Sequence, residues 1–157
     1  MSTDAPARDS QEARFGGEIR RVRDAAELSA AMAIRHRVFC DEQGVPVSDE
    51  VDGRDSEGLH LVAVEDGVVV ATCRICFVGS TAQFSRLAVD KPWRRQGIAT
   101  LLLELSEHES RSAKARRMVL HAQTYALPLY ENTGWRTRGA VFRDAGIDHI
   151  AMEKRLA

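Results

Sequence analysis

A strand-like run at residues 82–90 passes, through a break at Lys91-Pro92 and a glycine-containing loop, into a segment with helical periodicity. Apolar side chains recur on one face from Ile98 to Leu105, so this helix is predicted to reach about Ser112. A further strand-like run follows at residues 118–122. Two strands joined through a helix are expected to be parallel neighbours with a right-handed crossover. The rest of the chain must then supply elements that flank this unit.

The segments on either side of this unit predict antiparallel strands. Two runs rich in β-branched residues, 59–64 and 68–77, flank an Asp66-Gly67 turn, which is a strong hairpin signal. Two more runs, 135–142 and 147–154, predict a closing hairpin. Outside the parallel pair, neighbouring strands are therefore expected to be antiparallel.

Helices are expected to cover this sheet. Asp24 followed by Glu27 forms a capping box, and the helix that it begins is predicted to end at about Gln43. A brief helix is predicted at residues 126–132. The expected fold is of the α/β (α+β) class: a mixed, mostly antiparallel sheet with a central parallel strand pair, flanked by helices.

Length and charge point to one domain with a small partner. The 157 residues fit a single domain. Residues 1–17 are rich in Ser, Ala, Asp, Arg and Gly, which predicts a disordered tail ahead of a single domain at 18–157. With 22 basic and 23 acidic residues the formal charge is -1, so no global field favours nucleic acid or an anionic membrane. The apolar stretches fall far short of the roughly 20 residues of a membrane-spanning helix, so no membrane partner is expected.

Three cysteines bear on the compartment and on metal binding. An odd count, with no secretory signal in residues 1–17, favours reduced thiols and a cytoplasmic protein. Cys73 and Cys76 lie three apart in one strand-like run, so their side chains should point to opposite faces. They could not readily chelate one metal or form a redox pair, and no metal is expected.

The start of the predicted helix after the loop offers an anion site. A helix N-terminus carries unpaired N–H groups and a positive dipole, which suit a diphosphate. Gly97 and Ala99 lack bulky side chains, so phosphate oxygens could approach the amides of residues 96–99. Arg94 and Arg95 add positive charge. The alternative is an ordinary strand–loop–helix junction, since a short glycine-containing loop is a weak signal by itself.

Two motifs carry a resemblance to a known family. Arg94-x-x-Gly97-x-Ala99 behind Leu87-Ala88-Val89 resembles the acyl-CoA signature of the GNAT superfamily. Ala126-Leu-Pro-Leu-Tyr130-Glu-Asn-Thr-Gly134-Trp135 is similar to a second segment of that family. Two motifs in the right order, on the expected elements, are far more specific than either alone.

Within the superfamily the chain most resembles the ElaA-like and YjcF-like proteins, over roughly residues 19–156. The resemblance rests on Arg35-x-x-Val38-Phe39-x-x-Glu42-Gln43, on Asp52-Gly53, and on Gly146-Ile-x-His149-Ile. The substrates of that subgroup are poorly defined, so the closer match names no acceptor.

The resemblance implies an N-acetyltransferase that moves an acetyl group from acetyl-CoA, its cosubstrate, to a primary amine by direct attack in a ternary complex. A main-chain N–H near Leu87 or Val89 would polarise the thioester carbonyl, which can contribute several kcal/mol. Position 123 often holds Asn in the family, and Gln123 could make the same kind of hydrogen bond to the cofactor arm. The cofactor-binding residues implied are Leu87, Ala88, Val89, Arg94, Arg95, Gln96, Gly97, Ile98, Ala99, Thr100 and Gln123.

Tyr130 matches the tyrosine that the family uses as general acid toward the leaving thiolate. An ordinary phenol, with a pKa of about 10, is protonated at neutral pH and can serve this role. The alternative is an amphipathic core tyrosine on a short helix.

The group that takes the proton of the amine is left open by the sequence. Glu42, at the end of the first predicted helix, is the first candidate, with a surface cap interaction as its alternative. His60, His121 and His149 fall in predicted strands, where a lone histidine is more often structural. Arg35 lies in an apolar stripe and should pair with a buried carboxylate or a substrate acid, with extension of its guanidinium to solvent as the alternative. The expected substrate-binding residues are Arg35, Glu42, His60 and His149.

Residues 47–58 are expected to form an acidic loop that helps attract a cationic acceptor, because Asp49, Glu50, Asp52, Asp55 and Glu57 lie in it. The acceptor could be a small molecule or a peptide amine, and an exposed edge strand near the C-terminus would allow a homodimer. Two rival functions are an acyltransferase with another donor or acceptor, similar to acyl-homoserine-lactone synthases, and a non-catalytic acyl-CoA sensor. Tyr130 argues against the sensor, since a pure binding module needs no acid.

Overall fold

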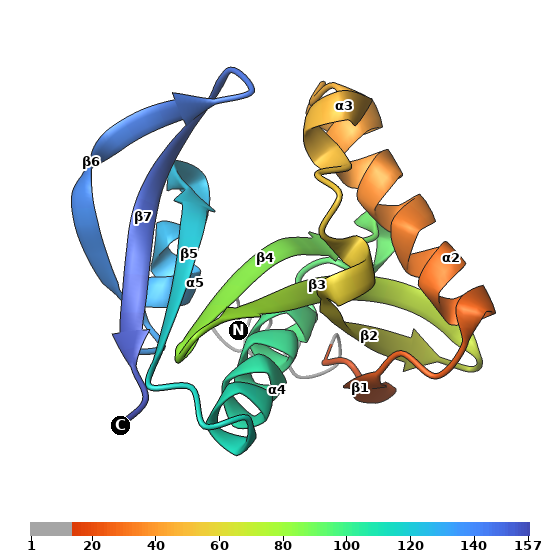
Figure 1. Ribbon diagram of the computed structural model, residues 1–157. Coiled ribbons are helices and arrows are strands. Elements are labelled where there is room, and N and C mark those ends of the chain that lie inside the picture. Colours follow the sequence, from red (N-terminus) through yellow and green to blue (C-terminus); the bar gives the residue numbers. More distant parts are fainter. Residues whose placement is uncertain (1–13) are drawn as a thin grey trace, which may run out of the picture.

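The computed structural model describes residues 14–157, and residues 1–13, most of the predicted tail, lie outside the described part (Figure 1). Seven strands form one mixed sheet in the order β1-β2-β3-β4-β5-β7-β6. The predicted α/β class and mixed sheet are confirmed. The strands are β1 (Glu18–Arg21), β2 (Leu59–Glu65), β3 (Val68–Val78), β4 (Thr81–Val89), β5 (Arg117–Gln123), β6 (Arg136–Asp144) and β7 (Ile147–Arg155). The helices and turns are α2 (Ala25–Arg35), η1 (His36–Glu42), α3 (Val47–Glu50), η2 (Asp55–Glu57), η3 (Lys91–Trp93), α4 (Ile98–Ser112), η4 (Thr124–Ala126) and α5 (Leu127–Glu131).

The first helix matches its predicted extent but changes type part-way. The Asp24 carboxylate accepts a hydrogen bond from the backbone N–H of Glu27 over 2.8 Å, as the capping box predicts. Glu27 in turn accepts from the backbone N–H of Arg23, so the reciprocal half of the box is shifted by one residue. After Arg35 the chain continues as the π-helix η1 up to Glu42.

Two apolar clusters occupy the two faces of the sheet. Along β2, Leu61 and Ala63 pack in the cluster that includes α4, whereas Val62 and Val64 pack in the cluster under α2. This alternation follows from the two-residue period of a strand. Cys73 contacts Ser106 of α4, with 3.4 Å between Sγ and Oγ, while the Cys76 thiol donates to the Arg54 carbonyl. The two thiols therefore point to opposite faces, as predicted.

The N-terminal boundary of the domain lies earlier than predicted. Phe15 is only 7% exposed, its backbone N–H donates to the carbonyl of Gln96 over 3.0 Å, and its ring meets Trp93 edge to face. The chain then forms β1, which pairs antiparallel with β2 and which we did not predict. The predicted tail boundary at residue 17 is therefore too late.

The parallel pair of β4 and β5 is confirmed, but it is short. The register joins only three residue pairs, from Thr81 with Arg117 to Gln83 with Val119. Beyond them β4 bulges: two residues, Arg86 and Leu87, lie opposite the single residue Cys73 of β3, and Arg86 has a φ of +58°. A bulge of this kind bends a strand and increases its twist.

Beyond these three pairs the sheet opens between β4 and β5. Figure 1 shows the two halves diverging, with β1–β4, α2 and α4 in one and β5–β7 with α5 in the other. Among residues 14–157, no helix has both the length and the apolar character needed to cross a bilayer.

Candidate active site

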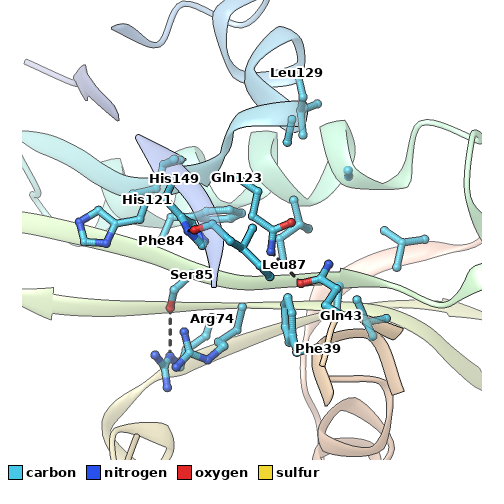
Figure 2. Close-up of a pocket in the computed structure, with 18 of the residues that line it drawn as sticks. Phe39, Gln43, Arg74, Phe84, Ser85, Leu87, His121, Gln123, Leu129 and His149 are labelled. Atoms are coloured by element: carbon cyan, nitrogen blue, oxygen red, sulfur yellow. Dashed lines mark hydrogen bonds between the residues drawn. The ribbon is translucent and has the colours of Figure 1, made fainter. Parts of the chain in front are cut away.

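A cavity of about 960 Å³ lies where β4 and β5 diverge (Figure 2). Its size is within the range of small-molecule and cofactor sites. It is lined by β4, by the loop and first turn of α4, by the end of β5, by α5, and by residues of η1 and β7. Of the predicted site residues, those that line it are Glu42, Leu87, Ala88, Val89, Arg94, Arg95, Gly97, Ile98, Ala99, Thr100, Gln123, Tyr130 and His149.

Three predicted site residues lie elsewhere. Gln96 does not line the cavity; its carbonyl accepts the backbone hydrogen bond from Phe15. His60 is 5% exposed, and its Nε2 is 2.8 Å from the carbonyl oxygen of Asp55. Arg35 is 1% exposed and bound to carboxylates. The positions of His60 and Arg35 do not support the expectation that they bind substrate.

The start of α4 leaves space for a ligand at its backbone. Gly97, the N-cap, has a φ of +82°, and a Cβ built there would meet nothing within 4 Å. The first backbone amides of a helix have no intrahelical partner, so this open space faces unpaired donors. Arg95 is exposed beside them, which adds positive charge. The local structure therefore fits an anionic group such as a diphosphate.

Arg94 connects the loop before α4 to the ends of β4 and η1 by hydrogen bonds. Its Nε donates to the carbonyl of Val89 over 2.9 Å, and its Nη2 donates to the carboxylate of Glu42 over 2.8 Å. Glu42 is therefore ion-paired at the end of η1. An amine that approached Glu42 would have to compete with Arg94 for its carboxylate.

Tyr130 lies on α5 with its ring in the core and lines the cavity. It is 6% exposed, and Trp135 meets it edge to face with 6.0 Å between ring centroids. Burial raises the pKa of Tyr130 above its ordinary value, because the phenolate would lose its hydration. The phenol therefore holds its proton at neutral pH, as a general acid requires. Tyr125, in contrast, is 76% exposed.

A row of side chains crosses the C-terminal half of the sheet beside the cavity. The register places Gln123 of β5 opposite His149 of β7, and His149 opposite Phe142 of β6. Directly paired residues share one face of a sheet. Gln123 donates from Nε2 to Oε1 of Gln43, on the far side of the cavity, over 2.8 Å. In Figure 2, Gln123 lies between the two histidines, His121 and His149, on one side and Gln43 on the other.

The acidic segment 47–58 is not a free loop, which corrects our expectation. It contains α3 and η2, and three of its carboxylates alternate with three arginines in a ring of ion pairs. The pairs and their N–O distances are Arg35–Glu50 2.7 Å, Glu50–Arg86 2.9 Å, Arg86–Asp52 3.2 Å, Asp52–Arg74 2.7 Å, Arg74–Asp55 2.9 Å and Asp55–Arg35 2.7 Å. Three positive and three negative charges cancel, so the predicted attraction for a cationic acceptor is not supported by these residues.

The ring holds two of its carboxylates, those of Asp52 and Asp55, in the ionised form. Hydrogen bonds from Arg74 hold the pKa of Asp52 well below its usual range. Burial would raise the pKa of Asp55, but hydrogen bonds and charge from Arg35 and Arg74 lower it overall. Arg74 also donates to Ser85 of β4 over 3.2 Å, drawn as the dashed line in Figure 2. The sequence predicted one pair of this ring, since Arg35 was expected to pair with a buried carboxylate, which is Glu50. Arg74, inside an apolar strand, carried the same signal and was missed.

Within the described residues, no group of three or more His, Cys, Asp or Glu is arranged to hold a metal ion. A diverging parallel pair, a glycine-capped helix start and a buried phenol together line one cavity.

Comparison with known proteins identifies the class. A family model described as "Acetyltransferase (GNAT) domain" matches residues 27–156. A relative from Bacillus subtilis (strain 168), whose name assigns it to the acetyltransferases, is 32% identical over 140 residues, covering 87% of this chain and 95% of its own. The N-acetyltransferase YjcF of the same organism is 31% identical over 129 residues, covering 82% and 92%.

Solved structures agree. An acyl-CoA N-acyltransferase from Pseudomonas aeruginosa matches with a TM-score of 0.78 and 25% identity, covering 89% of this chain and 99% of that one. Escherichia coli ElaA shares the fold with a TM-score of 0.78, 21% identity and the same coverage. The fold is that of an acyl-CoA-dependent N-acyltransferase. The chain belongs to the GNAT acetyltransferase family, which confirms the resemblance drawn from its motifs.

Proposed function

We propose that this protein transfers an acetyl group from acetyl-CoA to a primary amine, by direct attack in a ternary complex. The observation that carries the proposal is that the helix start at Gly97 and the buried phenol of Tyr130 line one cavity, opened where β4 leaves β5. A donor with a diphosphate at one end and a thioester at the other can span these two points.

In this proposal the diphosphate of acetyl-CoA lies at the first turn of α4, with Arg94 and Arg95 at its rim. Residues 97–100 contribute backbone N–H groups and leave room for the phosphate oxygens. Gln123 exchanges its hydrogen bond with Gln43 for one with the pantetheine arm. The backbone of Leu87 and Val89 lies along the arm, and a main-chain N–H there stabilises the oxyanion that forms during attack.

Tyr130 acts as the general acid in this scheme. The amine forms a C–N bond to the thioester carbon, the C–S bond breaks, and the thiolate takes the phenolic proton. A phenol whose pKa is raised by burial is protonated before each turnover, and it regains its proton from the amine nitrogen through solvent.

The acceptor is a small-molecule or peptide amine. Three free cysteines suit a reducing compartment, so we assign the activity to the cytoplasm. The edge strand β6 has mostly exposed residues, and the proposal includes a homodimer formed through this edge.

The first test is calorimetric titration with acetyl-CoA, CoA and a CoA fragment that lacks the diphosphate. Saturable binding of the first two, and none of the fragment, is expected. Amines are then screened by thiol release in the presence of acetyl-CoA. A folded protein that binds no acetyl-CoA would contradict the enzyme assignment, whereas binding without thiol release from any amine would favour a sensor.

A further inference from the structure

His149 is held in one orientation by two contacts. Its Nδ1 is 2.8 Å from the carbonyl oxygen of Ile147, and Phe142 stacks on its ring with centroids 5.8 Å apart and 23° between planes. A carbonyl oxygen only accepts, so Nδ1 must carry the proton of this hydrogen bond. In the neutral ring the lone pair is then on Nε2.

Nε2 of His149 is open to a ligand. No group in residues 14–157 forms a hydrogen bond with it, and it is not among the buried unpaired polar atoms. The residue lines the cavity. An oriented, solvent-accessible lone pair at a cavity wall meets the geometric requirement for a general base.

In the proposed function, the position of His149 brings its imidazole close to the thioester end of the pantetheine arm. It is directly opposite Gln123 across β5 and β7, and such paired side chains have Cβ atoms about 4.5–5.5 Å apart. Gln123 is the residue assigned to the pantetheine arm. An amine that reaches the end of this arm therefore comes within reach of the imidazole.

Two of the other groups considered for this role are occupied or wrongly placed, and the third, His121, lines the cavity with an edge contact to Phe142 but with no carbonyl bonded to its ring among residues 14–157. Glu42 is paired with Arg94, and Nε2 of His60 contacts a carbonyl away from the cavity. Strand β4, which lies along the cavity, contains no Asp, Glu or His. The carboxylates of the ion-pair ring are each bound by two arginines.

We propose that Nε2 of His149 accepts the proton of the acceptor's ammonium group. This inference rests on the proposed function. The ammonium N–H bond breaks and an Nε2–H bond forms, which gives a neutral amine and an imidazolium. The amine attacks the thioester, and the imidazolium returns its proton to solvent through the open cavity.

Few charged groups surround this histidine. From the β6–β7 hairpin they are Asp144 and the pair of Arg143 on β6 with Asp148 on β7, which are 3.4 Å apart. From β5 the neighbouring titratable group is His121, which meets Phe142 edge to face. Across the cavity lie Arg74 and Arg86, both neutralised by carboxylates.

The test compares two amines of similar size and different basicity. Ethylamine is protonated at neutral pH, whereas 2,2,2-trifluoroethylamine is mostly neutral. The variant is His149→Asn, whose amide N–H can still donate to Ile147 but which has no group in place of Nε2. The matched control is His108→Asn on the exposed face of α4, outside the cavity.

His149→Asn should bind acetyl-CoA with unchanged affinity and acetylate ethylamine about 100-fold more slowly. It should acetylate trifluoroethylamine within about twofold of the wild-type rate, because that amine has no proton to lose before attack. Equal losses for both amines would assign His149 a structural role, and no loss for either would overturn the proposal while leaving the proposed function intact.

A second measurement needs no acceptor. The ¹⁵N shifts of the His149 ring, recorded at pH 7.5 with acetyl-CoA bound, should report a protonated Nδ1 and an unprotonated Nε2. A neutral ring with its proton on Nε2 would overturn the proposal. Failure of the wild-type protein to bind acetyl-CoA would contradict the proposed function instead, so the two failures are distinguishable.

Discussion

Gln43 and Gln123 lie 80 positions apart in the chain and are joined by one hydrogen bond of 2.8 Å across the cavity. Gln43 follows η1 and Gln123 ends β5, so this bond links the two halves of the sheet at the point where their strands have separated. Both residues line the cavity. A ligand that passes between β4 and β5 must therefore replace this bond or pass beside it.

The two glutamines should differ in their effect on acetyl-CoA binding. Gln123→Leu should weaken affinity up to about tenfold, because one hydrogen bond to the arm, of about 0.5–1.5 kcal/mol, is lost. Gln43→Leu should not weaken affinity, since it removes only the partner that the ligand displaces. Calorimetry with acetyl-CoA measures both; equal losses would mean that the link between the halves, rather than the arm contact, matters for binding.

Two substitutions of Gly97 test the effect of backbone strain and the effect of negative charge separately. Gly97→Ala should cost about 1 kcal/mol of unfolding free energy, because φ is +82° and no atom lies in the way of the new Cβ. Gly97→Glu should also abolish acetyl-CoA binding, because its carboxylate faces the diphosphate. Urea unfolding and calorimetry measure the two effects. Retained binding in the glutamate variant would place the diphosphate elsewhere.

Tyr130→Phe should preserve acetyl-CoA affinity and lower kcat about 100-fold, because a general acid contributes to the chemical step and not to donor binding. The phenyl ring keeps the edge contact with Trp135, so stability should change little. Thiol release with the best amine of the screen provides the rate. Full activity at neutral pH would remove Tyr130 from the mechanism.

The ion-pair ring should make stability sensitive to acid. The pKa of Asp52 is lowered in the folded protein, so its contribution is complete above the unfolded pKa of about 3.9 and is lost as the pH falls toward the lower folded value. Unfolding free energy should therefore decrease from about pH 5 downward. Asp52→Asn should make this decrease shallower.

The matched control for this prediction is Asp66→Asn, at the β2–β3 turn, where asparagine tolerates the positive φ of 50°. Urea midpoints between pH 3 and pH 7 measure both variants. An unchanged slope in Asp52→Asn would show that other carboxylates dominate the acid response.

Local sequence patterns were sufficient to predict most of the helices and strands. The helix from Ile98, the Asp66-Gly67 hairpin and the parallel pair each depend on a periodicity or turn that lies within a short stretch of sequence. Strand β1 was missed because Glu18–Arg21 has one apolar residue in four and no alternation. Its pairing with β2 decides its structure, and sequence alone does not show that pairing.

The site was predictable where it is built from consecutive residues. The segment from Leu87 to Thr100 contributes its backbone in order, so a motif describes nearly all of it. The ion-pair ring joins residues from Arg35 to Arg86, and the role assigned to His149 depends on a carbonyl and two neighbouring strands. Such contacts are set by tertiary structure, and the interpretation of residues 47–58 as a free acidic loop failed for this reason.

The short parallel pairing between β4 and β5 has a consequence for how the substrate specificity of this protein can evolve. In the proposed function the donor side of the cavity is built on β4 and α4, whereas His149 and Asp144 belong to the β6–β7 hairpin, and only three residue pairs join β4 to β5. Substitutions in the hairpin are therefore weakly coupled to the helix start. Under the proposed function, evolution can alter which amine is accepted while the donor stays the same.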